Sequence, residues 1–509
     1  CWPDRTGINN NEIPDFFAKG RMDWYWWREA IQVPTVVDFA RQAGLTASTV
    51  TWPVMCASGA EYNIGEIWAP QEEDDPTPWF TRANSPAVEE IFEANKHMLR
   101  WMKTPQMDEF AAKCAADIIR AHRPDLMLLH LSYVDHQRHR LGVHGDLEHA
   151  FRFIDGQMGL VLDALEETGG VENTNIVLLG DHGQLYCDEM FHLNALFHRL
   201  GWLQTAEDGS LADYQVYAAN CSLSAHIYLR PEVDREMVYC VLLEQQKKYP
   251  KYLERIFTKE EAAQMHLTGD FDFVIEAGDR VCFGRALDGE QLITSVNDIK
   301  EYKPSVSTHG HLPWKGDKPP FIVAGPNAVS GRIIHGGRLI DHAPTILRLL
   351  GTGTHRNGRA SGGCPGAALM GRGLQAAPGL VCFDLDGTLY HDDRIYLRMI
   401  DYYFAGTPWE KEIGSVKAEM SRVLAGGNPA SAAAGLPPRN GGCVLARPPR
   451  CWLCPPRPHS CVRTPRPGWT GDAGPISPTA GAWPCTWPGV SAGTVRRSGS
   501  GSSWPGGIC

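Results

Sequence analysis

The sequence predicts an α/β fold in which a doubly wound, mainly parallel sheet carries helices on both faces. Short apolar runs that are typical of buried strands occur at residues 125–134 and 175–179, and stretches with helical periodicity alternate with them. Hydrophobic residues make up 43% of the 509 residues, which is enough for a large core and argues against a disordered or fibrous chain. Alternating helices and buried strands favour a parallel sheet between two helical layers.

Along the first half of the chain, the predicted elements follow one another closely. Apolar residues recur at helical spacing between residues 34 and 43, and Gly44 marks the end of that helix. The next predicted elements are a strand at 45–54, helices within 85–121, a strand at 125–134, a long amphipathic helix at 146–167 and a strand at 175–179. The two largely apolar runs are expected to be buried on both faces of the sheet.

The alternation of strands and helices continues to residue 351. Strands are predicted at 222–230, 271–278 and 321–326, and helices at 232–248 and 338–351. The last helix presents an apolar face that includes Leu339, Ala343 and Leu347, as expected for a helix that covers a sheet. The first domain is therefore expected to span residues 1–351.

The composition changes twice after residue 351. Residues 352–378 are rich in glycine without a sustained apolar period, which predicts a linker. Residues 379–426 begin with another apolar strand that ends in acidic residues, so we interpret them as a partial, Rossmann-like second unit. Residues 427–509 are dominated by Pro, Arg, Trp and Cys, and this composition predicts a disordered tail.

Charge and composition exclude several classes of partner. The formal net charge is -11, so no broad basic surface is expected to bind a nucleic-acid backbone. No run of about 18 apolar residues occurs, and the first residues lack the pattern of a signal peptide, so neither a membrane nor secretion is predicted. The cytoplasm is then the default compartment. The sequence does not determine the oligomeric state.

Acidic residues and histidines gather at three separate positions along the chain. Asp135 follows the first buried strand and His139 comes four residues later, while the second buried strand ends at Asp181-His182. A third cluster, STHGHLPW, contributes His309 and leaves His311 as the alternative. The carboxyl ends of strands in an open α/β sheet form the binding crevice, so these side chains are expected to converge on metal ions there.

Four segments, in this order, resemble the alkaline phosphatase superfamily, and in particular its type I phosphodiesterase and nucleotide pyrophosphatase branch. They are YVDHQRHRLGVHG, VLLGDHGQ, STHGHLPW and LIDHAPTILRLLG, and the resemblance covers about residues 1–351. It implies a doubly wound α/β fold and a site with two divalent ions, commonly Zn²⁺. Such enzymes cleave phosphodiesters, pyrophosphates or phosphomonoesters through a Thr or Ser nucleophile.

The resemblance assigns the ligands residue by residue. Asp135, His139 and His309 would bind one ion, with His311 as the alternative to His309, while Asp181 and His182 would bind the other. The remaining Asp ligand and the nucleophile of the family precede a segment like RTGINNN, and this sequence starts at Cys1, close to that segment. The sequence therefore predicts that the nucleophile region and the first strand are missing, which would leave apolar surface exposed and impair the activity.

A second resemblance lies in the segment FDLDGTLY of the second unit. It is similar to the first motif of the haloacid dehalogenase superfamily, which implies Asp384 as a phosphorylated nucleophile, Asp386 as general acid/base and Mg²⁺ as cofactor. The later motifs of that superfamily have no counterpart in the tail, so the unit is interpreted as a truncated enzyme.

Together these observations predict a metal-dependent hydrolase of phosphodiester or pyrophosphate bonds, with a small phosphate ester or nucleotide as substrate. Two alternatives remain open. One is a non-catalytic metal-binding fragment or pseudoenzyme. The other is a phosphomonoesterase, phosphonate hydrolase or phosphomutase of the same superfamily, because these activities share the metal ligands.

Overall fold

The structure, a computed structural model, describes residues 2–352 with gaps, together with residues 379–384. The gaps are residues 11, 15, 17–23, 68–76, 101–102, 299–304, 330–331, 333 and 335. Most of the predicted linker at 352–378, the helix expected after residue 394, Asp386 and the predicted tail at 427–509 lie outside the described residues. Among the described helices, none combines the length and the apolar character needed to cross a bilayer.

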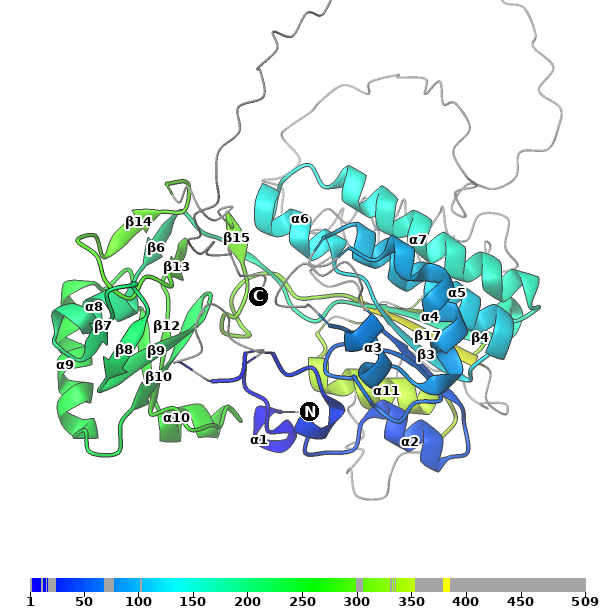
Figure 1. Ribbon diagram of the computed structural model, residues 1–509, viewed down its shortest axis with the longest axis horizontal. Coiled ribbons are helices and arrows are strands. Elements are labelled where there is room, and N and C mark those ends of the chain that lie inside the picture. The colour runs from blue at the N-terminus through cyan, green and yellow to red at the C-terminus, as the bar shows by residue number, and fades with distance from the viewer. Residues whose placement is uncertain are drawn as a thin grey trace, which may run out of the picture. The chain divides into compact units, whose positions relative to one another are not determined.

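A six-stranded, mostly parallel sheet forms the centre of the α/β fold, as the sequence predicts (Figure 1). The strands lie in the order β16-β4-β17-β3-β1-β2, and only β16 runs antiparallel to its neighbour. Their bounds are β1 Ala47–Val50, β2 Tyr62–Ile64, β3 Leu126–His130, β4 Thr174–Leu179, β16 Phe321–Ala324 and β17 Gly379–Asp384. Because the parallel strands share a direction, their carboxyl ends meet at one edge.

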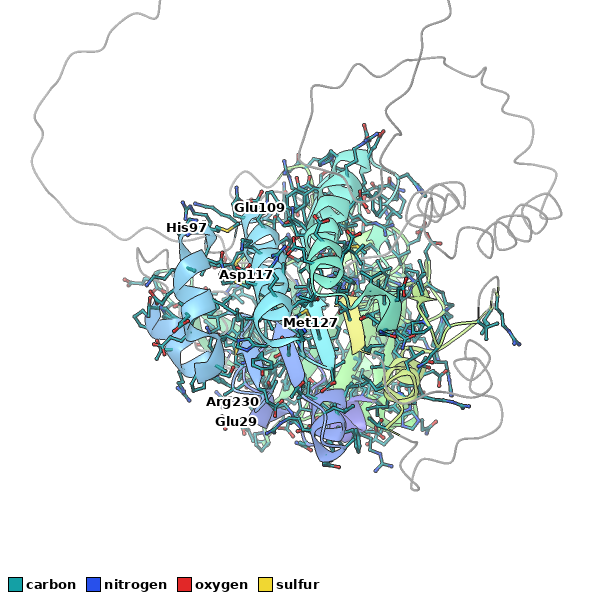
Figure 2. All side chains as sticks on the ribbon, turned by 90° about the vertical axis from the view of Figure 1, so that its right-hand side faces the viewer. Glu29, His97, Glu109, Asp117, Met127 and Arg230 are labelled. Atoms are coloured by element: carbon teal, nitrogen blue, oxygen red, sulfur yellow. The ribbon has the colours of Figure 1, made fainter. Side chains whose placement is uncertain are left out.

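Helices cover both faces of this sheet. On one face lie α4 (Glu89–Asn95), α5 (Gln106–His122) and α7 (Glu148–Glu167), whose apolar side chains share a core cluster with Met127 of β3 (Figure 2). On the other face, α2 (Val36–Gln42) and α11 (His342–Leu349) share a second core cluster with β3, β4 and β17. Successive side chains of a strand point to opposite faces of the sheet, so neighbouring residues of each strand pack into different cores.

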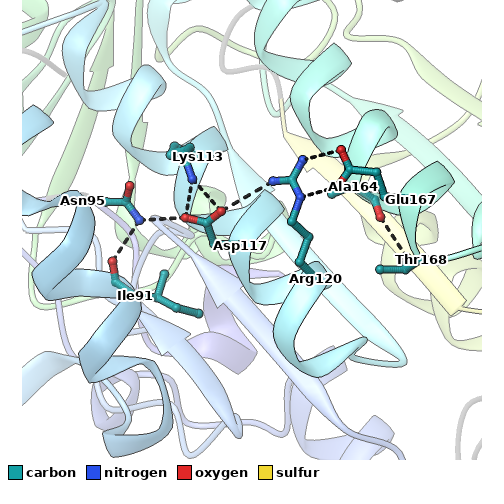
Figure 3. A network of polar contacts seen from close by, with 8 residues as sticks. All are labelled: Ile91, Asn95, Lys113, Asp117, Arg120, Ala164, Glu167 and Thr168. Atoms are coloured by element: carbon teal, nitrogen blue, oxygen red, sulfur yellow. Dashed lines mark hydrogen bonds and ion pairs between the residues drawn. The ribbon is translucent and has the colours of Figure 1, made fainter.

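Polar contacts join the three helices of the first helical layer (Figure 3). The Asn95 side chain of α4 donates to Asp117 of α5 at 2.9 Å, and Lys113 pairs with the same carboxylate. Arg120 of α5 reaches Glu167 of α7 at 2.6 Å. These pairs are partly exposed, so the apolar contacts beneath them contribute most of the stability of the layer.

A second, antiparallel sheet has the strand order β11-β12-β10-β9 and encloses its own core with α8 and α9. The bounds are β9 Val216–Cys221, β10 Ser224–Leu229, β11 Arg255–Thr258, β12 Phe273–Glu276, α8 Leu193–Arg199 and α9 Arg235–Lys248. Asp234 caps α9 by accepting hydrogen bonds from the backbone amides of Glu236 and Met237. Two strands of this sheet, β10 and β12, support a loop of the candidate site described below.

The remaining described elements are short. The helices are α1 Pro3–Thr6, α3 Thr77–Ala83, α6 Tyr133–Leu141 and α10 Lys259–Gln264, with 3₁₀ turns at Arg28–Ala30, Pro86–Val88, Lys96–Met98, Val171–Asn173 and Leu339–Asp341. The strands are β5 Leu185–Tyr186, β6 Glu189–Phe191, β7 Leu203–Thr205, β8 Leu211–Tyr214, β13 Val281–Phe283, β14 Ile293–Ser295 and β15 Ser307–Thr308.

The strand predicted at 125–134 is shorter in the structure, because α6 begins within it. Asp108 of α5 lies under this junction and accepts hydrogen bonds from the backbone amides of Ser132 at 3.0 Å and Tyr133 at 2.7 Å. A carboxylate at this position satisfies amides that have no partner at the start of a helix. The chain therefore leaves the sheet after His130 and turns into a helix that contains Asp135.

The sequence also predicts that the first strand of the sheet is missing and that apolar surface is exposed as a result. The absence of that first strand stays a prediction, but the centre of the sheet is filled, because β17 pairs with β3 on one side and β4 on the other. This strand belongs to the segment 379–426, which the sequence predicts to be a separate unit. The rest of that unit lies outside the described residues, so its independence stays a prediction.

Candidate metal centre

Asp135 and His139 are placed by the helix that follows β3. They lie one turn apart on α6, so their side chains share a face of the helix. The Nε2 atom of His139 lies 3.2 Å from Oδ2 of Asp135. Asp135 is 1% exposed and His139 is 8% exposed, so these two groups form the buried floor of the site.

Asp181 and His182 follow β4 at the same edge of the sheet. Gly180 separates them from the strand, and its amide donates to the carbonyl of Pro320 at 3.2 Å. The Oδ1 atom of Asp181 accepts from the backbone amide of His182 at 2.9 Å. Their side chains are 44% and 24% exposed, respectively, so this pair forms the more open side of the site.

His309 arrives from a third segment. It follows β15, which pairs with β5, and β5 begins three residues after His182. The imidazole ring of His309 stacks on that of His182 with 3.7 Å between the ring centroids, and lies 5.2 Å from the ring of His139. Three segments that are far apart in the sequence thus place histidines around one point.

Ligand atoms of Asp135, His182 and His309 all lie within 4.8 Å of one another. The resemblance assigns Asp135 and His309 to one ion and His182 to the other, so this group combines residues from both predicted sets. Carboxylate oxygen and imidazole nitrogen are donors that zinc commonly accepts, and the chemistry of the group therefore fits such an ion. In the described part of the chain, the group contains His309 and not His311.

His139 and His311 lie next to this group, and their pKa values are shifted in opposite directions. Burial alone would lower the pKa of His139, but the Asp135 carboxylate and the carbonyl of Ser307 outweigh it and raise the pKa above its usual value. Burial lowers the pKa of His311 to about 4, and the nearby His182 acts in the same direction. His311 is therefore a neutral imidazole at physiological pH, whereas His139 is electrostatically coupled to Asp135.

Two polar residues that the sequence analysis did not single out hold the floor of the site. The Gln184 side-chain amide donates to the Asp135 carboxylate, and its Oε1 atom lies 2.7 Å from the Ser307 hydroxyl. The Ser307 carbonyl lies 2.8 Å from Nδ1 of His139, which leaves Nε2 facing Asp135. Such outer contacts fix the orientation of metal ligands. The sequence signal that could have identified Gln184 and Ser307 is their position, because Gln184 lies close to Asp181-His182 and Ser307 lies close to His309.

The loop that carries His309 is held by the second sheet. Leu223 donates its amide to the carbonyl of His309 at 3.2 Å, and the hydroxyl of Ser224 donates to the carbonyl of Gly310 at 2.8 Å. Gly310 has a φ of 84°, and a side chain there would collide with the carbonyl of Cys221. This position therefore requires glycine, which explains the Gly between the two histidines.

Farther along the same loop, an ion pair provides a second anchor. The Lys315 ammonium lies 3.0 Å from Oε1 of Glu276, a residue of β12 that is 2% exposed. The same carboxylate oxygen accepts from the backbone amide of Leu312 at 3.2 Å. The second sheet thus positions the third segment of the site against the first two.

Comparison with known proteins places this arrangement in a family. The profile described as "Type I phosphodiesterase / nucleotide pyrophosphatase" matches residues 2–285, which is more than half of the chain. The chain belongs to this family. Its members are phosphoric ester hydrolases, in agreement with the enzyme class and the superfamily predicted from the sequence.

Individual relatives match over shorter stretches. The chain is 32% identical over 213 residues to ectonucleotide pyrophosphatase/phosphodiesterase family member 3 of Bos taurus, which is 40% of this chain and 20% of that protein. It is 39% identical over 93 residues to a 2,3-bisphosphoglycerate-independent phosphoglycerate mutase of Shewanella amazonensis, covering 16% of this chain and 18% of the mutase. The chain therefore spans about a fifth of the length of these relatives.

Among solved structures, phosphonoacetate hydrolase from Sinorhizobium meliloti 1021, in complex with phosphonoacetate, is similar at 16% identity with a TM-score of 0.41. The similarity covers 63% of this chain and 75% of the hydrolase chain.

Proposed function

We propose that this chain is a metal-dependent hydrolase of phosphodiester or pyrophosphate bonds, with a nucleotide or another small phosphate ester as its substrate. The observation that carries the proposal is the convergence of Asp135, His182 and His309, whose ligand atoms lie within 4.8 Å of one another. Membership of a family of phosphoric ester hydrolases supports the reaction class.

The proposed ligands of one divalent ion are Asp135, His139 and His309, and those of a second are Asp181 and His182. When bound, such ions act as Lewis acids that stabilise the negative charge on the oxygens of a phosphoryl group. The observed group contains Asp135 and His309 from the first proposed set and His182 from the second. Because ligands of both sets lie close together, the two proposed ions would be neighbours in one centre. Zinc matches the donor set best, because carboxylate and imidazole are the ligands of many catalytic zinc sites.

The chain's own groups prepare this centre for substrate. Gln184 and Ser307 hold Asp135 and His139 in fixed orientations on the buried floor. The partly exposed Asp181 and His182 lie on the side from which a small, charged substrate has access. A phosphate ester would therefore meet the centre from the side of Asp181, with the buried pair behind it.

The test combines metal content and hydrolysis. We expect Asp135→Ala and His182→Ala to lower the zinc retained after dialysis and to abolish hydrolysis of bis(4-nitrophenyl) phosphate. Asp279→Ala and His198→Ala change the same residue types at exposed positions and serve as matched controls. Unchanged zinc content in both site variants would contradict the proposal.

The substrate class is determined by comparing the rates at which the protein converts different phosphate and phosphonate compounds under the same conditions. Faster hydrolysis of bis(4-nitrophenyl) phosphate than of 4-nitrophenyl phosphate supports a diesterase, and the reverse supports a phosphomonoesterase. The similarity to the mutase is a specific reason to include isomerisation of 3-phosphoglycerate, and phosphonoacetate tests for a phosphonate hydrolase. Zinc binding without turnover of any compound would support the non-catalytic alternative.

A second activity in the segment 379–426 stays a prediction. It would use Asp384 as the phosphorylated nucleophile, Asp386 as general acid/base and Mg²⁺ as cofactor. Asp386 lies outside the described residues, and Asp384 is the last residue of β17 in the central sheet.

A further inference from the structure

The position of β17 is unexpected for a strand that comes after the Gly-rich segment. It lies between β3 and β4 and is parallel to both. Its Cys382 faces Leu128 on one side and Val177 on the other. Backbone hydrogen bonds extend the pairing beyond the strand ends, because Leu380 donates to the carbonyl of Asp125 and Leu131 donates to the carbonyl of Asp384, both at 2.8 Å.

The side chains of β17 are buried on both faces of the sheet. Val381 and Phe383 join the core under α5 and α7, whereas Leu380 and Cys382 join the core under α2 and α11. Phe383 and Cys382 are both 0% exposed. A strand with this burial is characteristic of the middle of a doubly wound sheet. Without it, β3 and β4 would present unpaired backbone groups and apolar side chains in the centre of the fold.

The carboxyl end of β17 reaches the edge where the candidate metal centre lies. Asp384 is opposite His130, the last residue of β3, and opposite Leu179, the last residue of β4. Asp181 follows Leu179 by two residues, and the chain after β3 leads to Asp135. Asp384 is 6% exposed, and a buried carboxylate is costly unless cations or hydrogen-bond donors stabilise its charge.

We propose that residues 379–384 serve as the central strand of the phosphodiesterase sheet and that Asp384 is a further carboxylate of its metal-binding edge. This inference rests on the proposed function for the identity of the ligand, a divalent cation such as Zn²⁺. Asp384 then acts in the same site as Asp135 and Asp181, and not as the nucleophile of a separate phosphatase unit. The motif that resembles a dehalogenase supplies a strand and a carboxylate to its neighbour domain.

Cross-linking tests the strand placement without reference to metal or activity. Leu128→Cys in the 509-residue chain places a thiol opposite the native Cys382, at the short separation of paired strands that a disulfide can bridge. We expect mild oxidation with diamide to link residues 128 and 382, as detected by mass spectrometry of proteolytic peptides. Val177→Cys tests the same register from β4 and remains available if the first variant does not fold.

The control for register is Met127→Cys, whose side chain points to the opposite face of the sheet. We expect no link between residue 127 and Cys382, and no link in Leu128→Cys combined with Cys382→Ala. Failure of Leu128→Cys and Val177→Cys to link to Cys382 in folded protein would overturn the strand placement. An equally strong link from Met127→Cys would overturn the register.

Metal binding tests the role of Asp384. The conservative variant Asp384→Asn keeps the size of the side chain and removes its charge, so we expect zinc affinity, measured by competition with a chromogenic chelator, to fall at least about tenfold. The absorption spectrum of the Co²⁺-substituted protein is expected to change as well. Asp279→Asn is the matched surface control and should leave both readouts unchanged.

The outcomes separate this inference from the proposed function. Unchanged affinity in Asp384→Asn, together with a loss in Asp181→Asn, would overturn the role of Asp384 and leave the proposed hydrolase intact. Unchanged affinity in both variants would overturn both. A phosphoryl group found on Asp384 after incubation with Mg²⁺ and 4-nitrophenyl phosphate would support the separate phosphatase unit and contradict our assignment.

Discussion

At the scale of single residues, the candidate site depends on groups that do not themselves belong to the predicted ligand set. Gln184 links Asp135 to Ser307, and Ser307 in turn orients His139 through its carbonyl. The histidine is left with Nε2 toward Asp135, which is the nitrogen available to an ion. The motif residues predict the chemistry, and these two neighbours determine the geometry.

Replacing Gln184 tests this support directly. Gln184→Ala removes the donor to Asp135 without removing a predicted ligand, so we expect zinc affinity to fall about tenfold to a hundredfold. Competition with a chromogenic chelator measures the change. Gln184→Glu keeps the shape but replaces the donor with an acceptor, and it should bind no better than Gln184→Ala. Wild-type affinity in both variants would show that the contact does not orient Asp135.

The carboxyl group of Asp108 predicts a pH dependence of stability. Burial raises its pKa from 3.8 to about 6, although the amides of Ser132 and Tyr133 act in the opposite direction. The folded state therefore binds the Asp108 proton more tightly than the unfolded state does, and this tighter binding stabilises the fold. The stabilisation is fully present below pH about 4 and is lost as the pH rises to about 6. In urea titrations between pH 4 and 7, Asp108→Asn should lack this decline. An unchanged pH profile in that variant would assign the decline to other groups.

At the scale of elements, local sequence accounts for some starts and ends but not for all. Thr35 and Asp38 form a capping box at the start of α2, and Asp234 caps α9, both from residues adjacent to the helix. The start of α6 instead uses Asp108, which is distant in the sequence. This difference explains why the strand predicted at 125–134 is longer than β3.

The contribution of β17 to the fold can be measured at the same scale. Phe383 is 0% exposed in the core beneath α5 and α7, so Phe383→Ala should reduce the free energy of unfolding by about 3–5 kcal/mol. Met237→Ala changes a side chain that is 42% exposed on α9 and should have an effect within about 0.5 kcal/mol. Chemical denaturation followed by tryptophan fluorescence compares the two. A Phe383→Ala variant as stable as wild type would be incompatible with a buried β17.

At the scale of the whole molecule, the candidate centre joins the two sheets. Asp135 and Asp181 follow strands of the parallel sheet, whereas His309 lies on a loop held by β10 and β12 of the antiparallel sheet. An ion bound by all three would connect these parts. Such an ion stabilises the folded state because the unfolded chain does not hold its ligands together.

Removal of metal should therefore lower the thermal stability of the whole protein. We expect treatment with EDTA to decrease the melting temperature and added Zn²⁺ to restore it, since at 100 times Kd a ligand contributes about 2.7 kcal/mol. Differential scanning fluorimetry measures the shift. Asp135→Ala should show little response to either reagent, whereas Asp279→Ala should respond like wild type. An equal response in both variants would place the stabilising ion elsewhere.

The sequence by itself determined the alternation of helices and buried strands, the edge at which Asp135 and Asp181 lie, and the family to which the chain belongs. These follow from short-range information: apolar period, strand ends and the order of acidic residues and histidines. Only the tertiary structure decided that His309 stacks on His182, that Gln184 and Ser307 orient the floor of the site, and that β17 fills the centre of the sheet. The physical reason is that pairing between distant strands depends on matching backbone hydrogen bonds and complementary apolar faces, and neither is visible in the local pattern of one strand.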